Sequence, residues 1–174
     1  IRMEIERKFD IKSIPSWMKE KCVRHKKIEQ IYLMIDFDND GKVLEEIRVR
    51  KAINLKTNQV DYKMTYKYGD GLSREEVETS ISADFYEMIR KTRHEGYNPI
   101  IKDYYMVQDI YNPGRLIEVS EVDGKFCYAE VEFPDEKTAN EYVWPYPEIL
   151  GPKGEMTNQP EERMSVYWLK SRVS

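Results

Sequence analysis

Pairs of like charges separated by one residue recur along this sequence, and they could hold a metal ion against a phosphate chain. Glu-x-Glu pairs occur near both ends of the strand-forming sequence, Glu4 with Glu6 and Glu130 with Glu132. On a strand, residues two apart point to the same side, about 7 Å from each other, so two such pairs could form a cage of carboxylate oxygens. Carboxylate and water ligands suit the hard cations Mg²⁺ and Mn²⁺.

Basic residues show a similar spacing and indicate a binding site for an anion. Arg48 and Arg50 form an Arg-x-Arg pair, and Lys63 and Lys67 lie on one face of their own segment. A guanidinium grips a phosphate through two parallel hydrogen bonds, which favours a polyanion of phosphates. Metal-assisted phosphoryl transfer needs these parts together in one cavity. The sequence contains no Gly-x-x-x-x-Gly-Lys-Ser/Thr motif, so the site is not a P-loop.

Alternation of charged and apolar residues predicts that these pairs lie on β-strands. The predicted strands are residues 3–9, 29–36, 46–51, 61–68, 74–81, 100–108, 115–122 and 127–133. Turn residues such as Asp123-Gly124 separate them and favour antiparallel hairpins. The predicted helices are residues 15–27, 83–95, 135–142 and 161–172. Ser82 is the expected N-cap of the second helix and Gly96 its stop.

These elements predict an α+β fold, an eight-stranded antiparallel β-barrel with flanking helices. The charged strand faces would point inward, and helices would cover the apolar faces outside. A barrel of this size is about wide enough to hold one small ligand, and closure removes the strand edges. A solvated sheet face is the alternative, with a partner-binding role. Like-charge pairs on four strands argue against it, because they repel unless counter-charges lie between them.

Length and composition predict one domain, residues 1–174, and 13 Tyr, 5 Phe and 3 Trp argue against disorder. The 28 Lys and Arg against 32 Asp and Glu give a net charge of −4, which argues against a nucleic-acid partner. The chain lacks an apolar run of bilayer length and a signal-peptide pattern, so we expect a cytoplasmic protein without a membrane partner. Cys22, Cys127, His25 and His94 are isolated, which predicts free thiols and no zinc site.

The charged strands resemble, in order along nearly the whole chain, the motifs of the CYTH superfamily, the triphosphate tunnel metalloenzymes. The opening Glu4-Ile5-Glu6-Arg7-Lys8-Phe9 resembles the Glu-x-Glu-x-Lys signature of that family. The other similar segments are residues 30–33, 48–50, 63–67, 74–78, 129–133 and 150–157. One Glu-x-Glu-x-Lys motif is a weak signal, but seven segments in family order are a specific one.

The resemblance implies metal-dependent hydrolysis of inorganic triphosphate inside a barrel tunnel, with Mg²⁺ or Mn²⁺ as cofactor, and is compatible with a homodimer. The opening looks most like the bacterial triphosphatase branch. The implied metal ligands are Glu4, Glu6, Glu76, Glu78, Glu118, Glu130 and Glu132. The implied phosphate-binding residues are Lys8, Arg48, Arg50, Lys63, Lys67, Arg74 and Lys102. Glu4, Glu6 and Lys8 are the expected catalytic residues.

Two positions depart from the family pattern. Tyr104 stands where the family has the Arg of a Lys-x-Arg pair, and Ser120 stands where it has the Asp of a Glu-x-Asp pair. Asp103 and Glu121 fall on the opposite strand face if the strands are regular. The alternatives are a class IV-type adenylate cyclase, an organic (thiamine or nucleoside) triphosphatase, and a non-catalytic module that binds polyphosphate or a nucleotide.

Overall fold

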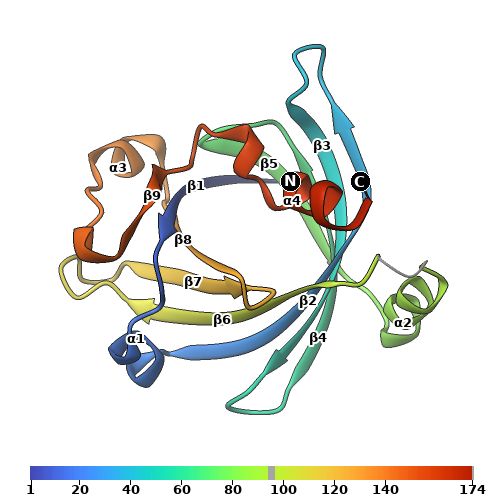
Figure 1. Cartoon of the computed structure of the whole chain (residues 1–174), viewed down its shortest axis with the longest axis horizontal. Coiled ribbons are helices and arrows are strands. Elements are labelled where there is room, and N and C mark those ends of the chain that lie inside the picture. The colour runs from blue at the N-terminus through green and yellow to red at the C-terminus, as the bar shows by residue number, and fades with distance from the viewer. Residues whose placement is uncertain (94–96, 174) are drawn as a thin grey trace.

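The chain forms a closed barrel of eight antiparallel strands with a ninth strand outside it (Figure 1). This computed structural model describes residues 1–93 and 97–173. The strands are β1 (Arg2–Ile11), β2 (Arg24–Phe37), β3 (Val43–Asn54), β4 (Val60–Tyr68), β5 (Ser73–Ser80), β6 (Ile100–Gln108), β7 (Leu116–Val122), β8 (Phe126–Glu132) and β9 (Leu150–Glu155). The helices are α1 (Ser16–Lys21), α2 (Ala83–Thr92), α3 (Glu136–Glu141) and α4 (Met164–Trp168). The eight-stranded antiparallel barrel predicted from the alternation is therefore confirmed.

The barrel closes at β1, the strand with the first Glu-x-Glu pair. The strand order is β5-β4-β3-β2-β6-β7-β8-β1, and β1 pairs with β5 to complete the ring. Glu4 lies opposite Arg74 of β5, and Glu6 lies opposite Glu132 of β8. Strand β9 continues the β5 side of β1, with Phe9 opposite Glu155. Closure thus places carboxylates from the two ends of the sequence side by side.

The apolar strand faces point outward and pack against the helices, as predicted. One core cluster joins Phe9 of β1 to Met18 of α1 and Ala139 of α3. A second cluster packs Tyr86 of α2 against Ile31 of β2. In Figure 1, α1, α2 and α3 lie outside the ring of strands. Because the apolar core lies outside the ring, the interior is left to the charged side chains.

The segment after β9 closes one end of the barrel. Met164, the first residue of α4, packs with the buried Tyr128 and lines the interior cavity. Just before α4, the Arg163 guanidinium donates hydrogen bonds to the carbonyl oxygens of Val43 and Gly69, at 3.2 Å and 3.1 Å. Figure 1 shows α4 within the outline of the ring. The two ends of the barrel are therefore built differently.

Two predicted helices are wrong in part. The helix predicted over residues 15–27 ends at Lys21, and Arg24 begins β2. Residues 24–27 pair with β6, and this long-range ladder overrides the basic ending that suggested a helix. The closing helix predicted over residues 161–172 is broken into a 3₁₀ turn at Pro160–Glu162, the short α4 and a π turn at Leu169–Val173. The break falls at Arg163, whose backbone is extended.

Helix α2 begins as predicted, because the Ser82 side chain accepts a hydrogen bond from the Phe85 backbone N–H at 3.0 Å. Its predicted continuation through His94 and Glu95 to Gly96 lies outside the described residues. Strand β9 was not predicted, since its Gly-Pro-Lys-Gly sequence reads as a turn. Cys22 and Cys127 are buried free thiols, as expected. Within the described residues, every helix is too short or too polar to cross a membrane.

Candidate active site

The barrel interior contains two adjoining cavities. The first has a volume of about 140 Å³ and lies under the C-terminal segment, with Arg163 and Met164 in its wall. The second has a volume of about 550 Å³ and lies toward the other end. Arg48 and Arg50 line both, so the cavities adjoin.

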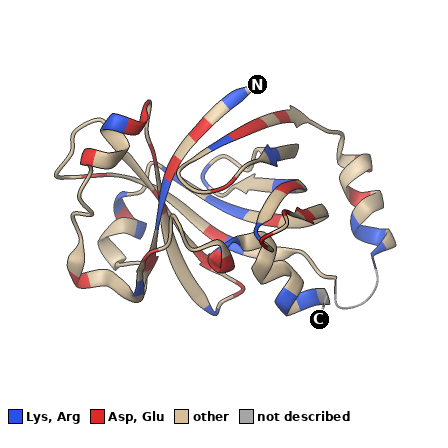
Figure 2. Cartoon of the chain, turned by 90° about the horizontal axis from the view of Figure 1, so that it is seen from above, with Lys and Arg blue, Asp and Glu red and all other residues tan. Residues whose placement is uncertain are grey.

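Every predicted site residue lines at least one of these cavities. Those in the first are Glu4, Glu6, Lys8, Arg48, Arg50, Lys67, Arg74, Lys102, Glu118, Glu130 and Glu132. The second adds Lys63, Glu76 and Glu78. Figure 2 shows acidic and basic residues interspersed along the strands that form the barrel. Strand alternation alone was sufficient to place these side chains inside.

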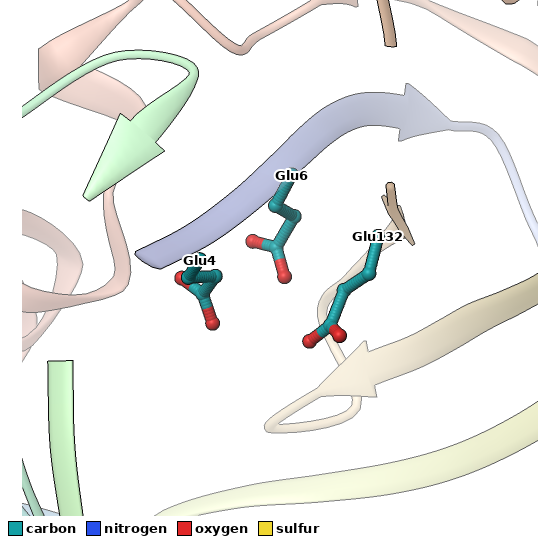
Figure 3. A group of neighbouring side chains, drawn as sticks. All are labelled: Glu4, Glu6 and Glu132. Atoms are coloured by element: carbon teal, nitrogen blue, oxygen red, sulfur yellow. The ribbon is translucent and has the colours of Figure 1, made fainter. Parts of the chain in front are cut away.

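Three carboxylates lie close enough to share one cation. Glu4 and Glu6 project from the same side of β1, and Glu132 faces them from the end of β8 (Figure 3). One oxygen of each lies within 4.8 Å of the others. In an octahedral Mg²⁺ site with bonds of about 2.1 Å, opposite oxygens are about 4.2 Å apart. The spacing and the all-oxygen donor set therefore fit Mg²⁺ or Mn²⁺.

The other four predicted metal ligands have different partners. Glu130 bonds with Glu6, Glu118 with Tyr104, Glu76 with Arg2, and Glu78 with Thr65 and Lys63. Glu76 and Glu78 line the second cavity, whereas Glu130 lines the first. The structure thus brings three of the seven predicted ligands into one cluster and sets the others around it.

The pKa values of Glu6 and Glu130 shift in opposite directions in the interior. Burial, and then the charge of Glu130, raises the pKa of Glu6 well above its usual value. Burial would also raise the pKa of Glu130, but a hydrogen bond from Glu6 and the charges of Lys102 and Lys8 lower it. Burial and the charge of Glu130 raise the pKa of Glu118 to about 7. A bound cation would compete with the proton on Glu6, since metal ligands must be deprotonated.

Two predicted bases are paired with buried carboxylates. Lys67 Nζ lies 2.9 Å and 3.1 Å from the two carboxylate oxygens of Glu4. Arg74 Nη2 lies 3.0 Å from Glu46 Oε1. Burial would raise the pKa of Glu46, but the charges of Arg74 and Arg48 lower it to about 2. Such pairs hold both side chains in fixed positions, since breaking one would leave a buried charge without its partner.

The half-buried Lys8 and the buried Lys102 bond instead to neutral oxygens. Lys102 Nζ donates to the hydroxyl of Tyr128 at 2.6 Å, and Lys8 Nζ donates to the backbone carbonyl of Glu162 at 2.8 Å. Both ammonium groups also lie over the Tyr128 ring, at 5.3 Å and 4.5 Å from its centroid. Burial lowers the pKa of both lysines. Within the described residues neither has a carboxylate at ion-pair distance, so both can offer positive charge to an anion.

Two arginines have buried nitrogen atoms without a hydrogen-bond partner among the described residues. These are Nε of Arg48 and Nε of Arg74, both from residues that line the first cavity. An unsatisfied buried donor costs about 1–3 kcal/mol. Burial would lower the pKa of Arg48, but the Tyr32 hydroxyl and Glu46 hold it above its usual range, so the side chain stays charged. These donors fit a ligand that brings acceptor oxygens, such as a phosphate.

The two departures from the family pattern lie at the centre of the barrel. The Tyr104 hydroxyl donates a hydrogen bond to the Glu118 carboxylate, and Ser120 is buried in the wall of the first cavity. Asp103 pairs with His25 instead, at 2.7 Å, and neither Asp103 nor Glu121 lines a cavity. The expectation that these two acids point the wrong way is confirmed, so they do not replace the missing groups.

Sequence reasoning missed three residues of the site. Glu46 precedes Arg48 by two residues, so the same alternation could have placed it inside. Tyr128 similarly precedes Glu130 by two residues. No sequence signal indicated Arg163, because the fold alone brings the C-terminal segment over the barrel.

Comparison with protein-family models and with curated proteins found no match to this chain. Solved structures are similar over nearly its whole length. Two crystal structures of NE1496, one described as an inorganic triphosphatase, are 26% and 25% identical to it, with TM-scores of 0.61 and 0.60. The alignments cover 95% and 97% of this chain and 97% and 96% of NE1496.

A structure with lower sequence identity is similar to this chain in fold only. HpAC1 from Hippeastrum, an adenylyl cyclase-like protein with a dominant triphosphatase activity, is 14% identical, with a TM-score of 0.54. The alignment covers 79% of this chain and 82% of HpAC1. The structure is consistent with the CYTH fold.

Proposed function

We propose that this protein hydrolyses inorganic triphosphate inside the barrel, with Mg²⁺ or Mn²⁺ as cofactor. The observation that carries the proposal is one cavity that holds both a three-carboxylate cluster and buried arginine donors without partners. A cation and a polyphosphate together satisfy both sets of groups. The similarity to the inorganic triphosphatase NE1496 supports the same conclusion.

Glu4, Glu6 and Glu132 would hold the metal, because their oxygens already lie within 4.8 Å of one another. When bound, the ion would neutralise phosphate oxygens and make a bound water more acidic. The Lys67 ammonium group donates to both carboxylate oxygens of Glu4 and so holds this carboxylate of the cluster in place. A cation bound by the cluster would replace the contact of Lys67 with Glu4 and the contact of Arg2 with Glu132, which is 2.7 Å long.

The basic residues would bind and orient the phosphate chain. The Nε groups of Arg48 and Arg74 can donate to phosphate oxygens, which would satisfy two buried donors. Lys8 and Lys102 supply further charge from β1 and β6. Because contacts such as that of Arg74 with Glu46 already hold these groups in place, the groups would stabilise developing charge with little reorganisation.

The test is phosphate release from inorganic triphosphate, with ATP, thiamine triphosphate and pyrophosphate assayed in parallel. Each substrate is offered with Mg²⁺, with Mn²⁺ and with EDTA. The proposal expects release from triphosphate that EDTA abolishes, with slower release from ATP. Cyclic AMP formed from ATP would favour the cyclase alternative. Calorimetric binding of triphosphate without turnover over hours would favour the binding module.

A further inference from the structure

Tyr104, one of the two departures from the family pattern, lies at the junction of the two cavities. It lines both of them, and so does Glu118, whose carboxylate accepts a hydrogen bond from the Tyr104 hydroxyl. Among the described residues, this hydroxyl is the one donor to Glu118. The described residues of β7 that line the cavities are Leu116, Glu118 and Ser120. Tyr104 therefore holds the one carboxylate that β7 brings to the interior.

The strand register places Glu118 between Tyr104 and the three-carboxylate cluster. Tyr104 of β6 is the partner of Ser120 of β7, so Tyr104 is a diagonal neighbour of Glu118 on one side. Glu130 of β8 is the partner of Glu118, so Glu132 is a diagonal neighbour on the other side. Diagonal neighbours on one face of a sheet lie within reach of long side chains. The Glu118 carboxylate could thus turn toward Tyr104 or toward Glu132.

In the structure Glu118 takes the first of these two positions. It bonds to Tyr104 and is not one of the three carboxylates whose oxygens lie within 4.8 Å of one another (Figure 3). Without metal, the like charge of Glu130 directly opposite would also repel Glu118 from the cluster. A bound divalent cation would oppose that repulsion, because it attracts the carboxylates around it. The hydrogen bond to Tyr104 then keeps Glu118 apart from the metal.

An additional carboxylate on the metal would be unfavourable for phosphate transfer. Mg²⁺ has octahedral coordination and, in sites that act on phosphates, is bound by one or two carboxylates together with phosphate oxygens and waters. The cluster already offers three carboxylates, Glu4, Glu6 and Glu132. A fourth would occupy a position that a phosphate oxygen or a water needs. Holding Glu118 away therefore leaves room for substrate.

We propose that Tyr104 is a positioning residue that holds Glu118 out of the three-carboxylate cluster. The resemblance implied that Glu118 is itself a metal ligand, and the proposal reverses that assignment for this chain. It rests on the proposed function in one respect, since it takes Glu4, Glu6 and Glu132 as the ligands of the metal.

The experiment measures Mn²⁺ binding to the whole chain by electron paramagnetic resonance, without triphosphate. The variants are Tyr104→Phe, Glu118→Gln and the double variant. The matched control is Tyr105→Phe, one residue along β6, which packs in the outer core cluster. This control also removes a hydroxyl that bonds to a carboxylate, that of Asp103 at 3.1 Å.

We expect Tyr104→Phe to tighten Mn²⁺ binding at least about threefold, because the freed Glu118 carboxylate can reach the ion. Glu118→Gln should change the dissociation constant less than about twofold, because it alters a group that does not touch the ion. The double variant should bind Mn²⁺ like Glu118→Gln, and Tyr105→Phe should bind it like the wild type.

Turnover of triphosphate gives a second readout. With Mn²⁺, kcat/KM should fall about tenfold in Tyr104→Phe and recover to within about threefold of the wild type in the double variant. Tighter metal binding with slower turnover, both reversed by Glu118→Gln, is a pattern that a mere loss of stability would not produce.

Two outcomes would overturn the proposal. One is Mn²⁺ binding weakened at least about tenfold by Glu118→Gln, which would make Glu118 a ligand. The other is Mn²⁺ binding that is unchanged in Tyr104→Phe. If the wild type binds Mn²⁺ but releases no phosphate from triphosphate, only the proposed function fails, because the Mn²⁺ measurements test Tyr104 without turnover.

Discussion

The two ends of the barrel hold similar Lys–Glu pairs in different states. At the end closed by the C-terminal segment, the side chains of Lys67 and Glu4 are 7% and 8% exposed. At the other end, those of Lys63 and Glu78 are 47% and 40% exposed. A buried pair is fixed in position and strongly coupled, whereas an exposed pair is worth about 0–1 kcal/mol and is screened by salt. The closed end is therefore suited to chemistry, and the other end to attracting and guiding an anion.

The largest effect is expected at the closed end, from the carboxylate cluster. Glu6→Gln should lower kcat/KM for triphosphate at least about 100-fold, because a neutral amide cannot replace a carboxylate ligand of the metal. The free energy of unfolding in urea should change little, since burial and the charge of Glu130 raise the pKa of Glu6 and a neutral amide matches the form that this environment favours. Glu75→Gln, on the exposed outer face of β5, is the matched control. Activity within threefold of the wild type in Glu6→Gln would contradict the assigned role.

Substituting one basic residue at each end compares how much the two ends contribute to kcat/KM. Arg48→Gln should lower kcat/KM about 100-fold, because it removes a charged group whose buried Nε has no partner among the described residues and could donate to phosphate. Lys63→Gln should lower it less than about tenfold, because Lys63 is exposed and screened. Steady-state kinetics at two salt concentrations would check both. Equal losses from the two substitutions would break the distinction between the ends.

Substitutions in the C-terminal segment should lower the free energy of unfolding. Arg163→Gln removes the hydrogen bonds to Val43 and Gly69, so the free energy of unfolding should fall by about 1–3 kcal/mol. Lys153→Gln breaks the exposed Lys153–Glu162 pair of the same segment and should cost less than about 1 kcal/mol. Urea denaturation measures both. If the two variants unfold at the same urea concentration, Arg163 does not anchor the segment.

The smallest expected effect is a pH-dependent change in the free energy of unfolding, and it arises at Asp123. Asp123, in the turn between β7 and β8, accepts hydrogen bonds from Tyr167 at 2.5 Å and Arg172 at 2.7 Å. Burial would raise the pKa of Asp123, but these bonds and one from the Ile101 backbone lower it. Its stabilising contribution is thus present above the unfolded pKa of about 3.9 and lost as pH falls through the lower folded value.

Asp123→Asn should therefore destabilise the protein by about 1 kcal/mol at pH 7. The difference from the wild type should shrink below about pH 4. Urea denaturation at several pH values measures it. A difference that stays constant from pH 7 to pH 3 would show that the carboxylate charge does not anchor this end of the chain.

Most of the site was predictable because one simple rule governs it. Period-two alternation assigns each strand residue to a face, so the inward position of Arg50, Lys102 or Glu130 follows from its neighbours. The same rule predicted that Asp103 and Glu121 would not replace the missing Arg and Asp. The eight strands were found for the same reason, although β2 begins at Arg24 and not near residue 29.

The sequence by itself determined which side chains are inside the barrel and the chemistry that they can perform. The tertiary structure decided which of them meet. Closure of β1 on β5 and β8 brought Glu132 to Glu4 and Glu6 but left Glu78 with Lys63. The C-terminal segment closed one end of the barrel, where Arg163 bonds to the carbonyl oxygens of Val43 and Gly69. These features arise from contacts between residues far apart in the chain, and local periodicity carries no information about such contacts.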